Sequence, residues 1–330
     1  MGWGQEPEPE YVVHYNAQPE RAERLIAGAD VVIAGSAPEA LVRGCIRRNQ
    51  LVFRYSERPL KNGPELKKYL PRLIKWHWRN PPWKKIHLLC ASAYTAEDYA
   101  RFGLFRGKAY RWGYFPEVKR YADIEKLLAD KQKASILWVG RLLDWKHPDD
   151  AVAMAAALKA EGYPFDLKLI GTGPLEQPLR EMIAAKGLSD CVHLLGSMTP
   201  ERVRWHMEES SIFLFTSDRK EGWGAVLNEA MNSGCAVVAS DAAGATAYLV
   251  QDGKNGLIYR ACDVDELYET VRKLLEDPLL VRQLGSEAYR AMTELWNAEN
   301  AAQRLVELIG QLLDSVETPQ LYETGPCSKA

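Results

Sequence analysis

The chain has 330 residues, of which 47% are hydrophobic and 26% charged, and its formal net charge is −2. This length exceeds that of most single hydrophobic cores and predicts two domains. The nearly neutral charge argues against nucleic-acid binding by the whole surface. The first ten residues are acidic and rich in proline, unlike a signal peptide, and no apolar run approaches the roughly 18 residues that cross a bilayer. We therefore expect a cytoplasmic protein.

Alternating strand and helix patterns occupy the first third of the chain. We expect strands at 11–15, 29–36, 50–55 and 86–91, with helices at 19–26, 38–48, 65–79 and from 92 to 103. Such alternation predicts an open parallel sheet, in which ligands collect at the carboxyl ends of the strands. This rule points at Gly35 and Ser36, and at Glu57 and Arg58, although an ion pair within the loop is the preferred interpretation of the latter two.

The segment 61–87 is strongly basic, with eight Lys or Arg residues against the single acid Glu65. Its interleaved aromatic residues are Tyr69, Trp76, Trp78 and Trp83. This composition suits contact with an anionic membrane, where each cation adds about 1 kcal/mol. The alternative is an amphipathic helix kinked at Pro71, whose cations lie in water and whose apolar side chains pack on the sheet. Those apolar side chains would be Leu66, Leu70, Leu73 and Ile74.

The chain divides near residue 133 into a first domain (1–133) and a second domain (134–312), followed by a tail (313–330). We expect 118–133 to be mobile, the tail to be disordered from Glu317, and 297–313 to form a helix that crosses back to the first domain. The six cysteines form no CxxC pair, so they are interpreted as buried thiols of a reducing compartment, without disulfides or zinc. His147 is expected in a loop and His193 in the core.

A pair of cations follows the first strand of the second domain. Gly140-Arg141 ends the strand 135–140, and Lys146 comes five residues later. A guanidinium offers a fork of donors to phosphate oxygens, and an ammonium offers a compact charge. Together they predict a site for a diphosphate, where negative charge grows on a leaving group.

Two carboxylates bracket a glycine-rich turn between two further strands. The stretch EGWGAVLNE places Glu221 before a helix and Glu229 one turn into it, between the strands 212–215 and 236–240. Gly222 and Gly224 allow close approach of the backbone to a ligand, and the helix amides near Ala225 can donate to a phosphate. Carboxylates are good acceptors for sugar hydroxyls, so both acids can bind one ligand.

The combination of EGWGAVLNEA with GR-x4-K resembles the retaining glycosyltransferases of family 4 (glycosyl transferases group 1) of the polysaccharide and lipopolysaccharide type. The resemblance implies the α/β GT-B fold, with two Rossmann-like domains facing across a cleft. It implies that Glu221 contacts the donor sugar, Glu229 the ribose, and Arg141 and Lys146 the diphosphate. The other nucleotide-binding positions that it implies are Gly140, Gly196, Ser197, Met198, Gly222, Trp223, Gly224, Ala225 and Val226.

The resemblance also implies a reaction. A nucleoside-diphosphate sugar would be the donor, and a cell-surface glycan or a lipid-linked intermediate the acceptor, with retention at the anomeric carbon. It implies a hexosyl transfer without a metal or cofactor. Membrane contact through the basic segment 61–87 would place the protein at the inner face of the cytoplasmic membrane. A dehydrogenase is excluded because no strand is followed by GxGxxG and a ribose-binding acid.

One departure from the family concerns the start of the chain. Family members begin with a strand, a glycine-rich loop and a long helix, and nothing like these precedes Tyr11. The first domain is therefore expected to be shortened, either because the chain is truncated or because another subunit completes the sheet. The alternative function is a non-catalytic pseudo-glycosyltransferase that scaffolds a polysaccharide-assembly complex.

Overall fold

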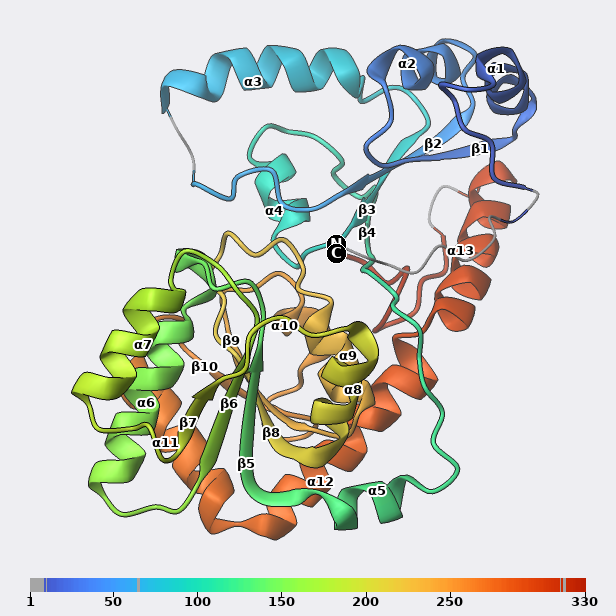
Figure 1. Cartoon of the computed structure of the whole chain (residues 1–330). Helices are drawn as coiled ribbons and strands as arrows, with labels where there is room; N and C mark the ends of the chain where they lie inside the picture. The colour runs from blue at the N-terminus through green and yellow to red at the C-terminus, as the bar shows by residue number, and fades with distance from the viewer. Residues whose placement is uncertain (1–8, 10, 64–65, 315, 317–318) are drawn as a thin grey trace.

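The computed structural model of the chain describes residues 9, 11–63, 66–314, 316 and 319–330, which form two parallel sheets with helices on their faces (Figure 1). The smaller sheet has the strand order β1-β2-β3-β4 and the larger the order β10-β9-β8-β5-β6-β7. Every strand pairing within the two sheets is parallel. The predicted α/β architecture of two Rossmann-like units is confirmed.

The smaller sheet lies above the larger one in Figure 1. Its strands are β1 (Val31–Ala34), β2 (Leu51–Ser56), β3 (Ile86–Cys90) and β4 (Ala109–Arg111). Its helices are α1 (Pro19–Gly28), α2 (Glu39–Arg47), α3 (Leu66–Arg79) and α4 (Thr95–Ala100). These strands and helices follow the expected alternation.

The larger sheet follows the short helix α5 (Ile124–Asp130). Its strands are β5 (Gln132–Val139), β6 (Asp166–Ile170), β7 (Val192–Leu194), β8 (Ser210–Phe215), β9 (Ala236–Ser240) and β10 (Leu257–Tyr259). Its helices are η1 (Asp144–Lys146), α6 (Pro148–Ala160), α7 (Glu176–Ala185), α8 (Pro200–Glu209), α9 (Val226–Asn232), α10 (Thr246–Leu249), α11 (Val264–Glu276), α12 (Pro278–Arg290), η2 (Ala291–Leu295) and α13 (Ala298–Leu313). The strand order reverses between β5 and β8, and such a switch point is where open sheets bind ligands.

Two apolar clusters cover the two faces of the larger sheet. One lies under α6, α7 and α11, and the other joins α9 and η2 to the opposite face. Strand β8 is buried along its whole length, as a strand covered on both faces must be. This packing fixes the carboxyl ends of β5 and β8, from which the predicted ligand residues extend.

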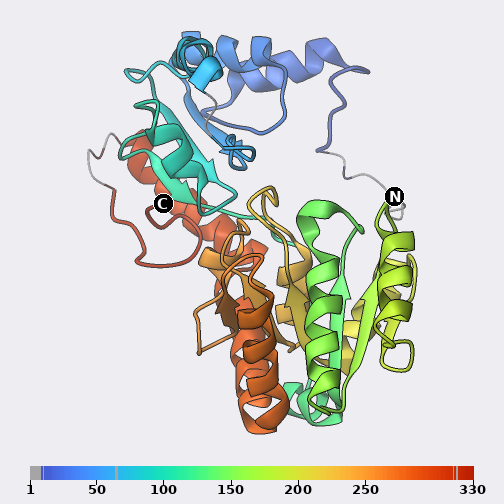
Figure 2. The ribbon, with the colours of Figure 1, turned by 90° about the vertical axis from the view of Figure 1, so that its left-hand side faces the viewer.

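Helix α13 connects the two domains. It follows the larger domain in sequence, yet Leu305 and Leu308 pack against Leu51, Phe53 and Leu89 of the smaller sheet. Figure 1 shows α13 beside the smaller sheet. The helix predicted at 297–313 is thus present as α13 and packs against the smaller sheet, as Figure 2 also shows.

Several sequence expectations differ from the structure. Residues 11–15 form no strand, whereas β4 was not foreseen because its three residues carry too short an apolar pattern. The tail is ordered at 319–330, where Ser328 is buried and its carbonyl accepts from the amide of Arg111 at 2.8 Å. Within 118–133, helix α5 is held to α12 by the ion pair Arg282–Glu125 at 2.6 Å, so this segment is not free.

Helix α3 contains Pro71, as expected, but its apolar residues do not all face the protein. Leu73 and Trp76 pack with Leu60 and Phe102. Leu70 and Ile74 instead point to solvent, with 62% and 63% of their surface exposed. The expectation that these two pack on the sheet is wrong, and the side chain of Leu66 lies outside the described residues. None of the helices in the described ranges has the length and apolar character that a bilayer span requires.

The cysteine and histidine expectations are met in part. Cys45, Cys90, Cys235 and Cys327 are buried free thiols, but Cys191 is partly exposed and Cys262 is exposed. His193 is not a core residue, because it lies on an accessible part of β7 and pairs with Asp166 at 3.0 Å. Apolar neighbours in sequence had suggested burial, but β7 is the edge strand of its sheet.

Candidate functional site

A cavity of about 950 Å³ lies between the two domains, at the carboxyl ends of β5 and β8. Most of its lining comes from the second domain, and Glu57 and Tyr114 reach it from the first domain and the linker. Nine of the predicted ligand residues line it: Gly140, Arg141, Lys146, Met198, Glu221, Gly224, Ala225, Val226 and Glu229. Residues far apart in sequence thus converge as the two motifs predicted.

Lys146 and Glu221 form an ion pair inside the cavity. The ammonium of Lys146 donates a short hydrogen bond to Oε2 of Glu221, and both side chains are largely buried. The hydroxyl of Ser217 donates to the same oxygen at 3.3 Å. The backbone of Lys146 is fixed in turn, because Thr216 donates to its carbonyl at 2.5 Å. The ammonium of Lys146 and the carboxylate of Glu221 are therefore held in place beyond the carboxyl end of β8 and are not free in solvent.

Glu229 lies on α9, one turn from its start. Burial raises the pKa of this carboxyl above its ordinary range, and the nearby guanidinium of Arg204 partly opposes that rise. Arg204 also braces the helix, because its Nη1 donates to the carbonyl of Glu229 at 3.2 Å and to Oδ1 of Asn232 at 3.0 Å. A desolvated carboxylate in a cavity binds a ligand hydroxyl more strongly than one in water does.

The turn before α9 exposes backbone to the cavity. Gly224 has a φ of 92°, and a Cβ there would clash with the ring of Phe215. No side chain of the described residues caps the start of α9. The amides of this turn are therefore available to a ligand, as the glycine spacing predicted.

Four predicted positions are not among the described residues that line the cavity: Gly196, Ser197, Gly222 and Trp223. Trp223 is fully buried, and its Nε1 donates to Oδ1 of Asn228 at 2.9 Å. Gly222 touches the other domain, because a Cβ on it would overlap the carboxylate of Glu57. Gly222 and Trp223 therefore support the turn before α9 without lining the cavity.

Glu57 and Arg58 do not pair with each other, so that expectation is wrong. Glu57 pairs with Lys61 at 2.6 Å and accepts from the hydroxyl of Tyr114 at 2.8 Å, whereas Arg58 pairs with Asp98 at 3.3 Å. Glu57 thereby reaches the cavity, as the rule for strand ends predicted. Gly35 lies instead in a separate hollow of about 230 Å³ in the first domain, with Glu39 and Arg54.

Sequence reasoning missed some lining residues, notably Lys119, Glu201 and Arg204. Lys119 belongs to the linker and the other two to α8, and none stands in a motif. Arg204 lies one helix turn from the capped start of α8, and no pattern in the sequence marks it as a ligand residue. Asp263 lies outside this cavity and caps α11, because its Oδ1 accepts from the amide of Glu266 at 3.0 Å.

Comparison with known proteins identifies the class. The family model "Glycosyl transferases group 1" matches residues 119–291, more than half of the chain, so the chain belongs to this family. Its two-domain arrangement is the GT-B fold. This agrees with the structure of Anabaena Alr3699/HepE in complex with UDP, which matches with a TM-score of 0.67 at 17% identity over 91% of this chain and 81% of that one.

Two relatives of distant similarity carry the name of a glycosyl transfer reaction. The amylovoran biosynthesis glycosyltransferase AmsK of Erwinia amylovora is 30% identical over 55% of this chain and 46% of its own length. Alpha-D-kanosaminyltransferase of Streptomyces kanamyceticus is 28% identical over 51% of this chain and 43% of its own length. The match to this chain thus spans less than half of either relative.

Proposed function

We propose that the chain is a retaining, family 4 type hexosyltransferase that uses a nucleoside-diphosphate sugar as its donor. The acceptor would be a cell-surface glycan or a lipid-linked intermediate. The observation that carries the proposal is the single cavity in which Arg141 and Lys146 meet Glu221 and Glu229. A site with two cations for a diphosphate and two acids for hydroxyls matches the two halves of such a donor.

The residues would divide the donor between them. Arg141 and Lys146 would stabilise the charge that grows on the departing diphosphate, with the backbone of Gly224 to Val226 as further donors. Glu229 would accept from the ribose hydroxyls, and the loop holding Met198 would lie against the base. Glu221 would bind the sugar once the donor displaces Lys146 from its carboxylate. Arg141 and Lys146 would thus stabilise the departing diphosphate in place of the metal ion that other transferases use.

The comparisons support the class of ligand. The Anabaena neighbour was solved with UDP, and another structure of the same protein contains UDP-glucose. AmsK belongs to polysaccharide biosynthesis by its name. Because similarity to these proteins is distant, we extend to this chain the class of donor and acceptor but neither a sugar nor a linkage.

The proposal is tested by turnover. The chain is incubated with UDP-, GDP- and ADP-sugars, and release of the nucleoside diphosphate is measured with and without lipid-linked acceptors. We expect release with one base, and expect Glu221→Gln to lower turnover while sparing nucleotide affinity. Glu201→Gln, a change of the same chemistry in the same cavity lining, is the matched control. Equal loss in both variants would contradict the role of Glu221.

A scaffold is the second candidate function, and the edge strand β1 favours it. Among the residues that the structure describes, β1 pairs only with β2 in the smaller sheet, and Ile33 on β1 is half exposed. An open edge can accept a strand from a sister subunit. Nucleotide binding without release of product from any donor, in a correctly folded sample, would favour this function.

We also propose that α3 contacts an anionic membrane surface. Leu70, Ile74 and Trp78 form one exposed stripe at helical spacing, and Trp83 beyond the helix is 79% exposed. The exposed cations Lys67, Lys68, Lys75 and Lys85 accompany them. Apolar and aromatic side chains in a basic field suit the headgroup region of a bilayer. This would place the enzyme at the inner face of the cytoplasmic membrane, near a lipid-linked acceptor.

A further inference from the structure

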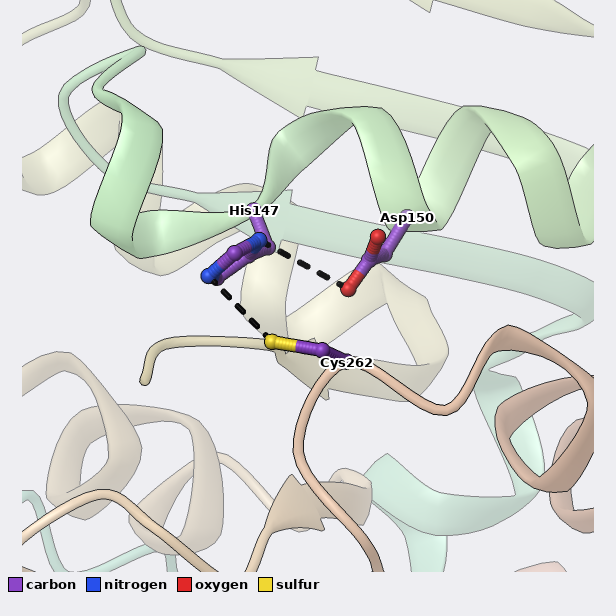
Figure 3. Close-up of side chains that lie close together, drawn as sticks. All are labelled: His147, Asp150 and Cys262. Atoms are coloured by element: carbon purple, nitrogen blue, oxygen red, sulfur yellow. Dashed lines mark hydrogen bonds and ion pairs between the residues drawn. The ribbon is translucent and has the colours of Figure 1, made fainter. Parts of the chain in front are cut away.

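Three side chains with metal-binding atoms meet beside the donor cavity but do not line it. They are His147 and Asp150, where η1 passes into α6, and Cys262, in the loop after β10. One candidate ligand atom from each lies within 4.8 Å of the others. Figure 3 shows His147 between its two neighbours, with Nε2 at 3.6 Å from Sγ of Cys262 and Nδ1 at 3.8 Å from Oδ2 of Asp150.

The backbone holds two of these residues in an unusual conformation. His147 has a φ of 47° and Cys262 a φ of 62°, both in the left-handed region that residues with a Cβ rarely adopt. Each costs on the order of 1 kcal/mol or more, and such strain is concentrated at functional sites. Asp150 is fixed separately, in the first turn of α6. Two strained loops and one helix thus bring three ligand types within 4.8 Å of one another.

The surroundings favour a cation. Within the described part of the chain, Oδ2 of Asp150 and the hydroxyl of Tyr259 are buried polar atoms that make no hydrogen bond. A buried carboxylate oxygen without a donor is unfavourable, and a positive ion would stabilise it. A further carboxylate is within reach, because Oδ2 of Asp218 lies 3.6 Å from Nε2 of His147.

The order Cys262, His147, Asp150 also resembles the line of groups in a cysteine hydrolase, in which histidine activates a thiol. A nucleophilic cysteine is activated by positively charged surroundings. Here the carboxylates of Asp150 and Asp218 lie beside His147 instead, at 3.8 Å and 3.6 Å from its two ring nitrogens. This negative charge hinders a free thiolate and attracts a metal ion, so the arrangement suits a ligand set better than a nucleophile.

We propose that His147, Asp150 and Cys262 form a binding site for a divalent metal ion of the zinc type, with Asp218 as an additional ligand. Imidazole nitrogen, thiolate and carboxylate are the donors that Zn²⁺ takes in proteins, at about 2.0–2.3 Å. A tetrahedral site with these lengths has ligand atoms about 3.3–3.8 Å apart. The present separations of up to 4.8 Å would require the set to close by about 1 Å when the ion binds.

Binding would release one proton, because the thiol of Cys262 loses its hydrogen to solvent when sulfur bonds the metal. The ion would also join loops that carry donor-site residues. Lys146 directly precedes His147, and the carbonyl of Asp218 accepts from the amide of Glu221 at 3.0 Å. The amide of Asp218 donates to the carbonyl of Trp145 at 2.8 Å. The metal site would therefore tie the loops after β5, β8 and β10 together, whether or not the proposed transfer reaction is correct.

The test is metal binding by the full chain, with Zn²⁺ alone as the probe and a chromogenic chelator as competitor. We expect one ion per chain. His147→Asn keeps a residue that tolerates a positive φ, and Cys262→Ser is nearly isosteric. Each should weaken binding by more than ~100-fold, above the ~10–100-fold effect of losing a group that only orients a ligand. Substitution with Co²⁺ should give a thiolate-to-metal absorption band that Cys262→Ser abolishes.

Cys191→Ser is the matched control, because Cys191 is a partly exposed free thiol of the same domain. It should leave the affinity and the cobalt band unchanged. Circular dichroism of each variant checks that it is folded. The proposal is overturned if the folded wild-type chain binds no Zn²⁺, or if Cys191→Ser weakens binding as much as Cys262→Ser does. It is also overturned if both site variants bind as tightly as the wild type.

Discussion

The contact between Gly113 and Trp223 gives a sharp test of how the donor turn is supported. Gly113 is in the linker between the domains, and Trp223 is in the turn between Glu221 and α9. A Cβ added at Gly113 would lie 2.5 Å from both Cη2 and Cζ2 of the indole, too close for any pair of carbon atoms. Trp223 is fully buried, so its ring cannot move into solvent.

Gly113→Ala should therefore lower the free energy of unfolding by about 1–3 kcal/mol, the usual cost of overpacking a core. Trp223→Phe removes the outer ring atoms that cause the clash. It also leaves Oδ1 of Asn228 without its indole donor, at a cost of about 1–3 kcal/mol. In the double variant the alanine meets no indole, so the two losses should not add. We expect a coupling energy of about 1 kcal/mol or more in the favourable direction.

The assay is urea unfolding of the four proteins, followed by tryptophan fluorescence and circular dichroism. Gly107→Ala is a control for the loss of glycine without a clash, because a Cβ at Gly107 meets open space, although its φ of 68° adds backbone strain. Gly28→Ala has neither clash nor positive φ and should be nearly neutral. If Gly113→Ala destabilises the wild type and the Trp223→Phe background equally, the indole does not fill the space beside the linker, and the reasoning fails.

Three further predictions concern charge. Burial raises the pKa of Glu229 above its ordinary value of 4.5, so its ionised form destabilises the fold at pH 7. Glu229→Gln should therefore raise the unfolding free energy at pH 7, and this gain should shrink as the pH falls through the raised pKa toward 4.5, as unfolding at pH 7 and pH 4.5 would show. The same variant should weaken nucleotide binding about tenfold or more, measured by calorimetry. Burial and the charge of Lys108 lower the pKa of His87 from 6.5 to about 4. Between these pH values the unfolded chain binds a proton on His87 that the folded chain does not, so the free energy of unfolding should fall as pH drops from 6.5 to 4. His87→Phe should reduce this dependence of the unfolding free energy on pH, and an unchanged dependence would contradict the burial of His87. Leu70→Ser combined with Ile74→Ser should reduce cosedimentation with anionic phosphatidylglycerol vesicles, while the free energy of unfolding stays nearly unchanged because both side chains are exposed. If the wild-type chain binds neutral phosphatidylcholine vesicles as strongly as anionic ones, the lysines around α3 do not contribute to membrane binding.

The sequence predicted most of the second domain because its signals are local. Buried strands such as β8 are continuous apolar runs in the sequence. The turn before α9 needs a positive φ at Gly224, and the glycine itself indicates this conformation. Two sequence motifs contain the four main candidate residues, which are Arg141, Lys146, Glu221 and Glu229. Strands β5 and β8 pair with each other in the sheet, and this pairing brings the two motifs together.

Features that depend on contacts between distant segments were not predictable. Arg204 reaches Glu229 because α8 packs beside α9, and the tail is ordered because it pairs with β4. Trp223 looked like a ligand residue from its place in the motif, but its ring fills the space under Gly113. His147 and Cys262 are 115 residues apart, so no spacing rule could join them. Tertiary packing decides such positions.

The central claim is a working nucleotide site between the domains. Calorimetric titration of the full chain with UDP, GDP and ADP tests it most directly, since it needs no acceptor. We predict that one of the three binds, and that Arg141→Ala lowers its affinity by about 10–100-fold, the loss of a charged hydrogen bond. Arg180→Ala, which removes a surface arginine paired with Glu176, should leave binding unchanged. Absence of binding to all three nucleotides by a folded sample, or equal binding by Arg141→Ala, would contradict the account.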